Sequence, residues 1–180
     1  LYNNSDNYYE TVAQLEDLSQ LIERDQSFWR HTPTVIPLRS RVLSDRYGMR
    51  KDPFTKKRGY HAGIDFRAKR GSPVHAPADG TVRIADRKSG FGLLVELQHG
   101  RGFFPGKKNP VRYRTRFAHL SKIKVRRGQK IKRGDLLGLV GSTGRSTGPH
   151  LHYEIIINGR RTNPLFPISR FNPDQRLYRN

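Results

Sequence analysis

From residue 36 onward, apolar residues occur in short runs separated by turn signals. Asp79 and Gly80 form one such signal before an alternating run at 81–85, and residues 92–98 and 112–121 are two further runs of strand length. Two Arg-Gly turn signals interrupt residues 125–140. Many short strands joined by frequent turns predict an antiparallel β architecture. We therefore expect a mainly β domain.

The N-terminal segment has a different period. Its apolar residues recur every three or four positions, at Tyr8, Val12, Leu15, Leu18 and Ile22. This spacing predicts a helix over about residues 8–28 whose apolar stripe packs on the following domain. Prolines at 33 and 37 prevent its continuation. The predicted organisation is a helix and linker at 1–35, the β domain at 36–167 and a tail at 168–180.

Two histidine motifs stand out within the β domain. In the run that begins His150-Leu-His152, alternate side chains share one face of a strand, so both imidazoles point the same way with Glu154 behind them. Their Cα atoms would lie ~6.6 Å apart. One imidazole could then bind a metal while the other acts beside it, although the spacing does not tell which.

The second motif is His61-Ala-Gly-Ile-Asp65. In a straight strand its two polar ends would be ~13 Å apart, which is too far to share an ion with bonds of ~2.0–2.2 Å. The segment must therefore curl, and Gly59 and Gly63 stand where a turn or bulge permits that. A lone histidine is most often a surface or core residue, but two such motifs together favour a metal site.

Three sequence blocks contain these motifs and a further histidine, in the order Gly-Tyr-His61-Ala-Gly-Ile-Asp65-Phe, Arg-Phe-Ala-His119-Leu-Ser and Gly-Ser-Thr-Gly-Arg-Ser-Thr-Gly-Pro-His150-Leu-His152-Tyr-Glu. Together they resemble the signature blocks of the LytM/lysostaphin-type zinc metallopeptidases of the M23 peptidase family. The resemblance covers about residues 36–167. It implies the antiparallel β-sheet peptidase domain of that type.

By this resemblance, one catalytic zinc ion is held by His61, Asp65 and His152. His119 and His150 remain as the catalytic pair. Three protein ligands leave a fourth position open for water. One imidazole of the pair would take a proton from water and later deliver one to the leaving amine, and the other would stabilise the oxyanion. Which of the two does which stays open.

The other three histidines lie outside the blocks and are not assigned to the site: His31, His75 and His99. The chain also contains a stretch that is longer than the tight hairpin usual in the family, at residues 101–112. Its Gly and Pro content predicts no regular structure. It is either a tolerated surface insertion, which costs little, or a rim element that limits entry of bulky strands to the site.

The resemblance also implies hydrolysis of peptide cross-links in bacterial peptidoglycan, in the periplasm or elsewhere in the cell envelope. The block from Ser44 to Phe54 is similar to Gram-negative members, which cut D-alanyl–diaminopimelate cross-links. We therefore predict a D,D-endopeptidase. The alternative is a non-catalytic LytM-type regulator that activates another cell-wall hydrolase. Such members lose metal ligands, whereas every expected position is filled here.

The formal net charge of +20 is unevenly spread. Residues 1–29 carry a net −5 and residues 30–180 a net +25, and there are thirteen Lys or Arg but no carboxylate between Arg101 and Arg133. Such a field attracts polyanions. Given the motifs, the expected partners are peptidoglycan peptide stems and anionic envelope polymers, and not nucleic acid. Many of these charges could equally serve only solubility.

The absence of cysteine excludes disulfides and thiolate metal sites. No run approaches the ~18 apolar residues of a membrane span, and no signal-peptide pattern is present. Because the chain begins at Leu1 and not at Met, we expect a mature or trimmed fragment. Membrane contact is then expected only through an N-terminal anchor that this chain lacks.

Overall fold

The computed structural model describes residues 12, 14–20, 26, 29–40, 42–102, 104, 109–166, 168 and 178–179. The strands assigned within this part of the chain are β1 (Val42–Asp45), β2 (Gly48–Lys51), β3 (Arg58–His61), β4 (Ile64–Arg67), β5 (Pro73–His75), β6 (Gly80–Lys88), β7 (Gly92–Gly102), β8 (Val111–Leu120), β9 (Lys122–Ile123), β10 (Lys130–Ile131), β11 (Leu136–Leu139), β12 (His150–Ile157), β13 (Arg160–Thr162) and β14 (Tyr178–Arg179).

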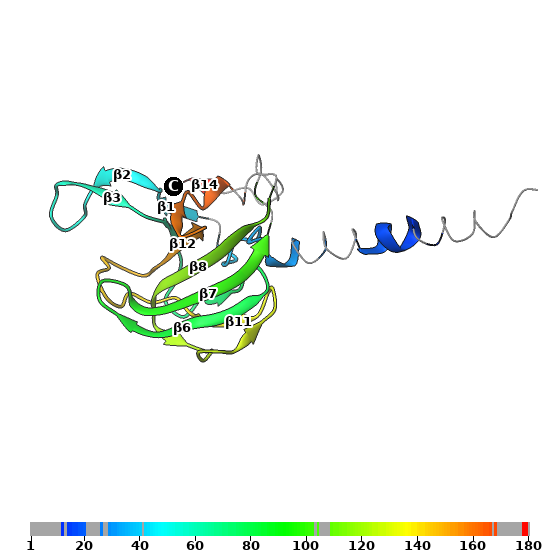
Figure 1. Ribbon diagram of the computed structural model, residues 1–180. Coiled ribbons are helices and arrows are strands. Elements are labelled where there is room, and N and C mark those ends of the chain that lie inside the picture. Colours follow the sequence, from blue (N-terminus) through cyan, green and yellow to red (C-terminus); the bar gives the residue numbers. More distant parts are fainter. Residues whose placement is uncertain are drawn as a thin grey trace, which may run out of the picture.

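The domain is organised around a nine-stranded sheet (Figure 1). Its strand order is β10-β6-β7-β8-β12-β4-β1-β14, and β13 pairs with β12. A three-stranded sheet, β5-β11-β9, and the β2–β3 hairpin complete the architecture. Apart from the parallel pair β1–β14, the described pairs are antiparallel. The prediction of a mainly β, antiparallel fold is therefore confirmed.

The large sheet has one apolar and one polar face because its sequence alternates. On β12, Leu151, Tyr153 and Ile155 are fully buried and belong to the hydrophobic core. Val74 of β5 and Leu137 of β11 belong to the same buried cluster, so the small sheet covers this face. The histidines of β12 face the other side.

The β2–β3 hairpin extends from the domain beside the polar face of the large sheet (Figure 1). Its register pairs Gly48 with His61 and Lys51 with Arg58. The hairpin therefore ends on a strand residue, His61, that belongs to the first histidine motif.

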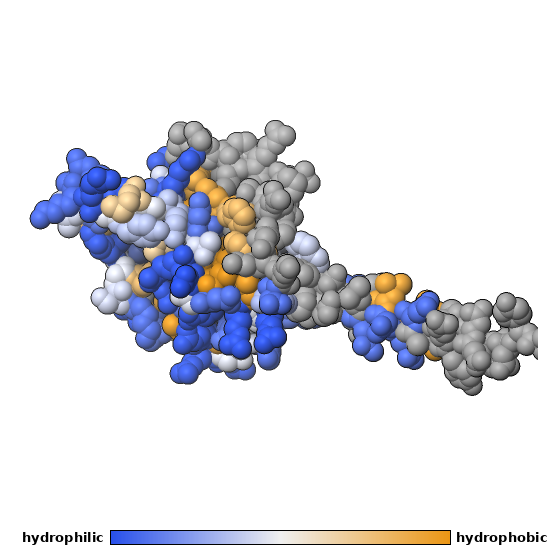
Figure 2. Space-filling model, turned by 45° about the horizontal axis from the view of Figure 1, so that its top comes forward, coloured by the Kyte–Doolittle hydropathy of each residue, from blue (hydrophilic) through white to orange (hydrophobic). Residues whose placement is uncertain are grey.

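The N-terminal segment is helical where it is described, at residues 14–20 and again at 29–31. This agrees with the predicted helix and extends it beyond residue 28. Leu15 and Leu18 are 61% and 53% exposed, and the segment projects from the β domain with hydrophobic surface uncovered (Figures 1 and 2). The prediction that the apolar stripe packs on the domain is therefore wrong for residues 14–20. Residues 1–11, 13, 21–25 and 27–28 lie outside the described part, and Tyr8 and Ile22 of the predicted stripe are among them.

Residues 32–40, which include the end of the predicted linker, contain no helix or strand. Two apolar side chains of this segment, Ile36 and Leu38, are nevertheless buried in the core. The segment is thus fixed to the domain by hydrophobic contacts. Within the described residues, no helix is long and apolar enough to cross a membrane.

His99 is fully buried on β7, away from the two histidine motifs. Its Nδ1–H donates to the Asp79 carbonyl at 2.8 Å, and its Nε2 lies 2.7 Å from the Thr115 hydroxyl. Burial lowers the pKa of His99 to about 4, although the bond to Asp79 acts in the opposite direction. The side chain is therefore a neutral, hydrogen-bonded part of the structure, consistent with its exclusion from the predicted site.

The buried His99 should make the stability of the domain depend on pH. Its pKa is about 4 in the folded chain against an ordinary value of 6.5, so between these values the unfolded chain binds more protons and stability rises with pH. Neutral His99 contributes fully above pH 6.5, and up to about 3 kcal/mol is lost as the pH falls towards 4. Denaturant unfolding at several pH values should show this slope in the native chain.

The variant His99→Gln should show a flatter dependence over the same pH range. His75→Gln is the matched control, because His75 is only partly buried in β5, and it should keep the native slope. An unchanged slope in His99→Gln would show that other groups control acid stability.

Candidate functional site

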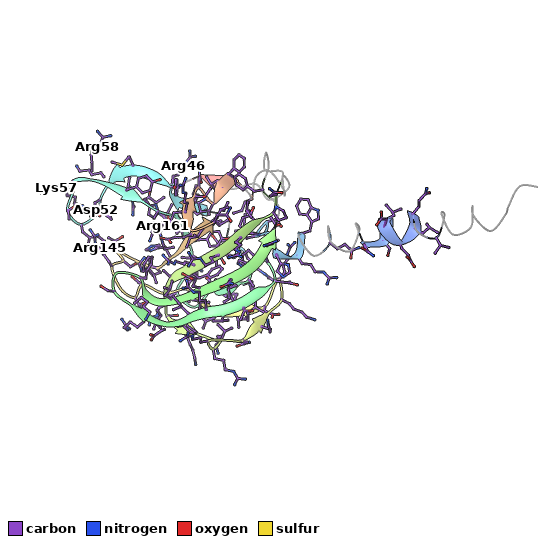
Figure 3. The ribbon with its side chains drawn as sticks, in the orientation of Figure 1. Arg46, Asp52, Lys57, Arg58, Arg145 and Arg161 are labelled. Atoms are coloured by element: carbon purple, nitrogen blue, oxygen red, sulfur yellow. The ribbon has the colours of Figure 1, made fainter. Side chains whose placement is uncertain are left out.

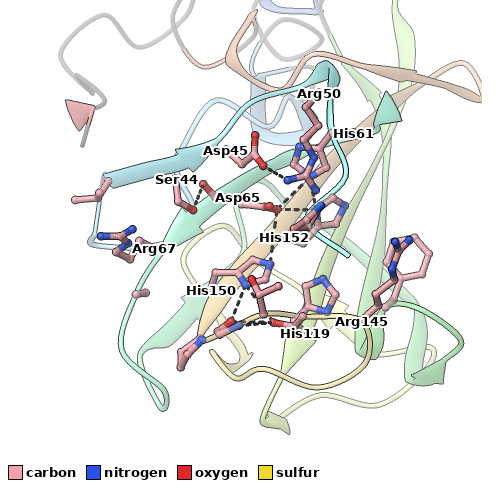
Figure 4. Close-up of a pocket in the computed structure, with 18 of the residues that line it drawn as sticks. Ser44, Asp45, Arg50, His61, Asp65, Arg67, His119, Arg145, His150 and His152 are labelled. Carbon is pink, nitrogen blue, oxygen red and sulfur yellow. Dashed lines mark hydrogen bonds and ion pairs between the residues drawn. The ribbon is translucent and has the colours of Figure 1, made fainter. Parts of the chain in front are cut away.

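Three side chains converge on the polar face of the large sheet (Figure 4). His61 Nε2 lies 3.0 Å from His152 Nδ1 and 3.2 Å from Asp65 Oδ1. His152 Nδ1 lies 2.8 Å from the same Asp65 oxygen. All three residues are buried, and they form the one group of potential metal ligands found among the described residues.

Strand pairing brings these residues together. In the antiparallel register of β4 and β12, Asp65 lies directly opposite His152, so their side chains share one face. The chain curls between β3 and β4, as the spacing of His61 and Asp65 predicts. At Gly63, inside that curl, a Cβ atom would lie 2.4 Å from the Tyr153 carbonyl oxygen and 2.9 Å from the His152 ring. Only glycine permits this close approach.

The donor set fits zinc in chemistry and in size. Two imidazole nitrogens and one carboxylate oxygen are a donor set found in catalytic zinc sites. Donors at ~2.0–2.2 Å from one ion in tetrahedral geometry would lie ~3.3–3.6 Å apart. The three observed separations are 2.8–3.2 Å, so movements of a few tenths of an ångström would admit the ion.

In each of the two candidate histidine ligands, the other ring nitrogen also has a hydrogen-bond partner. His61 Nδ1–H donates to the Arg46 carbonyl at 2.7 Å. His152 Nε2 lies 3.3 Å from Glu154 Oε1, to which it can donate. A hydrogen bond to the outer nitrogen fixes the tautomer and leaves the inner nitrogen available to a metal. The sequence places Glu154 behind the histidines, but the role of holding His152 becomes visible only in the structure.

Glu154 is itself held by arginines. Its Oε2 accepts from Arg116 at 3.2 Å and from Arg161 at 3.3 Å. Arg116 also donates to the fully buried Glu96 at 2.6 Å. Alternating charges therefore run across β12, β8 and β7 beside the site. The sequence shows these charges but gives no signal for their pairing, because it depends on strand register.

The two other motif histidines lie against the ligand group. The ring of His119 is 4.8 Å from that of His150 and 5.8 Å from that of His152, centre to centre. His119 Nδ1–H donates to the Thr143 carbonyl, and His150 Nδ1–H to the Gly148 carbonyl, each at 2.8 Å. Neither Nε2 atom makes a hydrogen bond within the described part of the chain, and His150 Nε2 lies 3.9 Å from Asp65 Oδ1.

His119 reaches this face through an unusual backbone conformation. On β8, Phe117 belongs to the buried core, and Ala118 pairs with His152, so simple alternation would turn His119 towards the core. Its φ of 59° places it in the left-handed region, which few residues other than glycine adopt. The reversal brings the imidazole to the site, at a cost on the order of 1–3 kcal/mol.

The environment sets the protonation of these groups. Burial, together with neighbouring His150, lowers the pKa of His119 to about 4, against the opposing bond to Thr143. Burial alone would lower the pKa of His152, but hydrogen bonds to Asp65 and Glu154 outweigh it and raise the pKa to about 9. The carboxyl of Asp65 is also buried, yet its bonds to the histidines hold its pKa well below its usual range. A metal at His152 Nδ1 must therefore displace a proton.

All five predicted site residues line one groove: His61, Asp65, His119, His150 and His152. The β2–β3 hairpin and residues 145–150 form its walls. Figure 3 shows Asp52 at the hairpin tip and Arg145 beneath it, and their side chains form an ion pair at 2.7 Å.

The loop at 101–112 takes no part in the groove walls, because none of its described residues lines the groove.

The prediction that this loop limits entry to the site is therefore wrong for its described residues. His119 lies near one end of β8 and Val111 at the other, which separates the loop from the site by ~26 Å of extended strand. The expectation of no regular structure is also wrong at the loop ends. There, β7 and β8 continue their pairing with Arg101 opposite Arg112. Residues 103 and 105–108 lie outside the described part.

The site geometry agrees with a comparison of the sequence with protein families. Residues 59–164, more than half of the chain, match the sequence model for peptidase family M23. The matched region contains all five predicted site residues. The chain belongs to peptidase family M23. The resemblance to LytM/lysostaphin-type peptidases is thereby confirmed.

Relatives of this M23 chain include an uncharacterized metalloprotease of Haemophilus influenzae, which is 46% identical over 70% of this chain and 25% of that protein. The DD-carboxypeptidase/endopeptidase Mpg of Neisseria meningitidis is 41% identical over 72% of this chain and 27% of that protein. The chain thus spans about a quarter of the length of these curated relatives. Among solved structures, a zinc-containing peptidase from Vibrio cholerae has a TM-score of 0.58 at 35% identity, covering 70% of this chain and 35% of that one.

The first prediction for the M23 site separates metal ligands from the other histidines. His61→Ala, Asp65→Ala and His152→Ala should each lose most of the bound metal, because each removes one of three donors. His119→Ala and His150→Ala should largely retain it. Elemental analysis of the purified variants measures this directly. Metal loss in His150→Ala with retention in His152→Ala would reverse the assignment.

A second prediction concerns Glu154. Glu154→Leu should weaken metal binding about 10–100-fold, the usual effect of removing a hydrogen-bond partner of a metal-bound histidine. Glu154→Gln should lose less, since its amide oxygen still accepts from His152 Nε2. Competition with a chromogenic chelator measures the affinity. Asp86→Asn is the control, because Asp86 is an exposed carboxylate of β6 that pairs with Lys88 and does not line the groove. Native affinity in Glu154→Leu would exclude this role.

Proposed function

We propose that this M23 chain is a zinc-dependent peptidoglycan endopeptidase that hydrolyses D-alanyl–diaminopimelate cross-links. The carrying observation is the buried group of His61, Asp65 and His152 with two further imidazoles beside it in one groove. Three protein donors suit a catalytic zinc ion, which keeps a position for an exchangeable ligand. A structural zinc site would use four protein donors and would not need the neighbouring histidines.

In this proposal, His61, Asp65 and His152 hold the zinc ion. Zinc supplies Lewis acidity there, polarising a carbonyl group and lowering the pKa of water. Because His119 Nδ1–H donates to the Thr143 carbonyl, its Nε2 carries the lone pair and is suited to accept a proton as general base. His150 Nε2 faces the same space from β12, and because Nδ1–H already donates to the Gly148 carbonyl, the ring in its imidazolium form can donate a hydrogen bond from Nε2 to the developing oxyanion. Backbone carbonyls orient both rings through Nδ1.

The substrate assignment draws on the relatives and on charge. One relative carries the name DD-carboxypeptidase/endopeptidase, and another is named a peptidoglycan DD-endopeptidase. A diaminopimelate cross-link has carboxylates beside the scissile amide, and several cationic side chains line the groove. A glycine bridge offers no such charge. The proposed place of action is therefore the peptidoglycan, outside the cytoplasm.

A non-catalytic regulator of another hydrolase is the rival function. It would need the groove to bind a partner but would not need a complete ligand group or two oriented imidazoles. Among the described residues, every motif position of the family is filled and lies within the groove. The observations therefore favour the enzyme.

The decisive assay offers the zinc-loaded chain purified diaminopimelate cross-linked muropeptide dimers and, separately, pentaglycine. The dimers should fall to monomers and pentaglycine should stay intact, as followed by chromatography and mass spectrometry. His150→Ala is the control, since it should retain zinc and lose most of the activity. General acid–base and oxyanion groups each typically contribute 10²-fold or more.

Pentaglycine cleavage with intact dimers would contradict the assigned bond and leave the zinc chemistry standing. Turnover of neither substrate by the loaded chain, together with activation of a second hydrolase, would support the regulator instead.

A further inference from the structure

The groove is lined by four cationic side chains: Arg50, Arg67, Lys69 and Arg145. Two of them are already paired. Arg50 forms an ion pair with Asp45. Arg145 binds both oxygens of Asp52 at 2.7 and 2.8 Å. Neither of these guanidinium groups is therefore fully available to an anionic ligand.

Arg67 and Lys69 differ, because neither has a carboxylate partner among the described residues. Both side chains are exposed. Figure 4 shows Arg67 on one side of the histidine cluster and Arg145 on the opposite side. The groove therefore has one end where the positive charge is neutralised by the protein and one end where it is not.

Strand register places Arg67 next to the reaction centre. It is the last residue of β4 and shares a face with Asp65, two positions earlier. In the β4–β12 pair it lies directly opposite His150. Side chains opposite each other in an antiparallel pair start with Cβ atoms ~4.5–5.5 Å apart. A flexible arginine at this position can therefore reach a group close to the scissile bond.

The surroundings of Arg67 favour an anion. The groove lining includes three serines, Ser40, Ser44 and Ser72, and the Ser40 hydroxyl donates to the Arg67 carbonyl at 2.8 Å. The two carboxylates among the described lining residues are committed elsewhere: Asp45 pairs with Arg50, and Asp65 with the histidines. The guanidinium fork matches a carboxylate in two parallel hydrogen bonds.

We propose that Arg67 is a specificity-determining residue that binds the substrate carboxylate adjacent to the scissile amide. This inference rests on the proposed function. In a diaminopimelate cross-link, the carboxylate in question is attached to the carbon that bears the scissile amide nitrogen. Because the carboxylate is only two bonds from that nitrogen, binding it beside His150 also fixes the position of the amide.

The test uses two synthetic cross-linked peptides that differ only at this group, one with the free carboxylate and one with a carboxamide. The zinc-loaded chain should cleave the carboxylate peptide with a kcat/KM at least roughly tenfold higher, since hydrogen bonds to charged groups contribute about that much. Arg67→Gln should lose this preference by slowing cleavage of the carboxylate peptide while leaving that of the carboxamide peptide nearly unchanged. Arg67→Lys keeps the charge without the fork, so its preference should be intermediate.

Arg70→Gln is the matched control, because Arg70 is exposed and close in sequence but does not line the groove; it should behave like the native chain. Zinc content, measured for each variant, shows whether the site is intact. Equal cleavage of the two peptides by the native chain overturns this inference and leaves the proposed function standing. Loss of the preference in Lys69→Gln but not in Arg67→Gln overturns the assignment to Arg67. Cleavage of neither peptide overturns the proposed function and this inference with it.

Discussion

The antiparallel pairing of β4 with β12 is the interaction on which the site depends. It sets Asp65 opposite His152 and Arg67 opposite His150, so one backbone ladder places a candidate ligand pair, a candidate catalytic histidine and a cationic side chain on one face. Because side chains alternate, a shift of one residue would turn the histidines into the core and the core residues into the groove. Fully buried Leu151 and Tyr153 on the opposite face oppose such a shift. Packing of the core thus maintains the geometry of the groove.

The polar face tolerates buried charge because each charge is paired. Glu96 is fully buried and contacts three arginines, Arg83, Arg114 and Arg116. Removing one partner of a buried pair is far more destabilising than the pair is stabilising. The row of charges therefore acts as a rigid support behind Glu154 and, through it, His152. Three arginines of this basic chain thus have a structural role around one buried carboxylate.

The two ends of the groove are joined to the rest of the domain by different contacts. Thr143 connects three segments. Its hydroxyl donates to the Leu120 carbonyl and accepts from the Leu93 N–H, and its backbone carbonyl accepts from His119 Nδ1–H. The ion pair between Asp52 and Arg145, with the Arg145 guanidinium 4.7 Å from the Phe54 ring centre, joins the hairpin to the opposite wall. At the Arg67 end the described residues form a hydrogen bond from the Ser40 hydroxyl to the Arg67 carbonyl but no ion pair with the guanidinium, and in our proposal the substrate neutralises this end.

Much of this architecture is encoded locally. The alternation in residues 150–155 predicts which side chains face the core, and the spacing of His61 and Asp65 predicts that the chain must curl. The length of the strands and their turns predicts an antiparallel sheet. These features depend on residues close in sequence, and all of them agree with the structure. The helix at residues 14–20 could also be predicted, because the spacing of its apolar residues is a local property of the sequence.

Other features depend on contacts between distant segments, and the sequence could not supply them. The left-handed conformation of His119 is imposed by its place between Phe91 and Thr143, since its N–H and Nδ1–H donate to their carbonyls. The support of His152 by Glu154 and Arg116 requires the register of β8 and β12. The distance of the described residues at 101–102 and 109–112 from the groove follows from the length of β7 and β8. The exposure of Leu15 and Leu18 follows from the direction in which the helix leaves the domain. All of these features are set by contacts between segments that are distant in the sequence, and the local pattern of residues carries no information about such contacts.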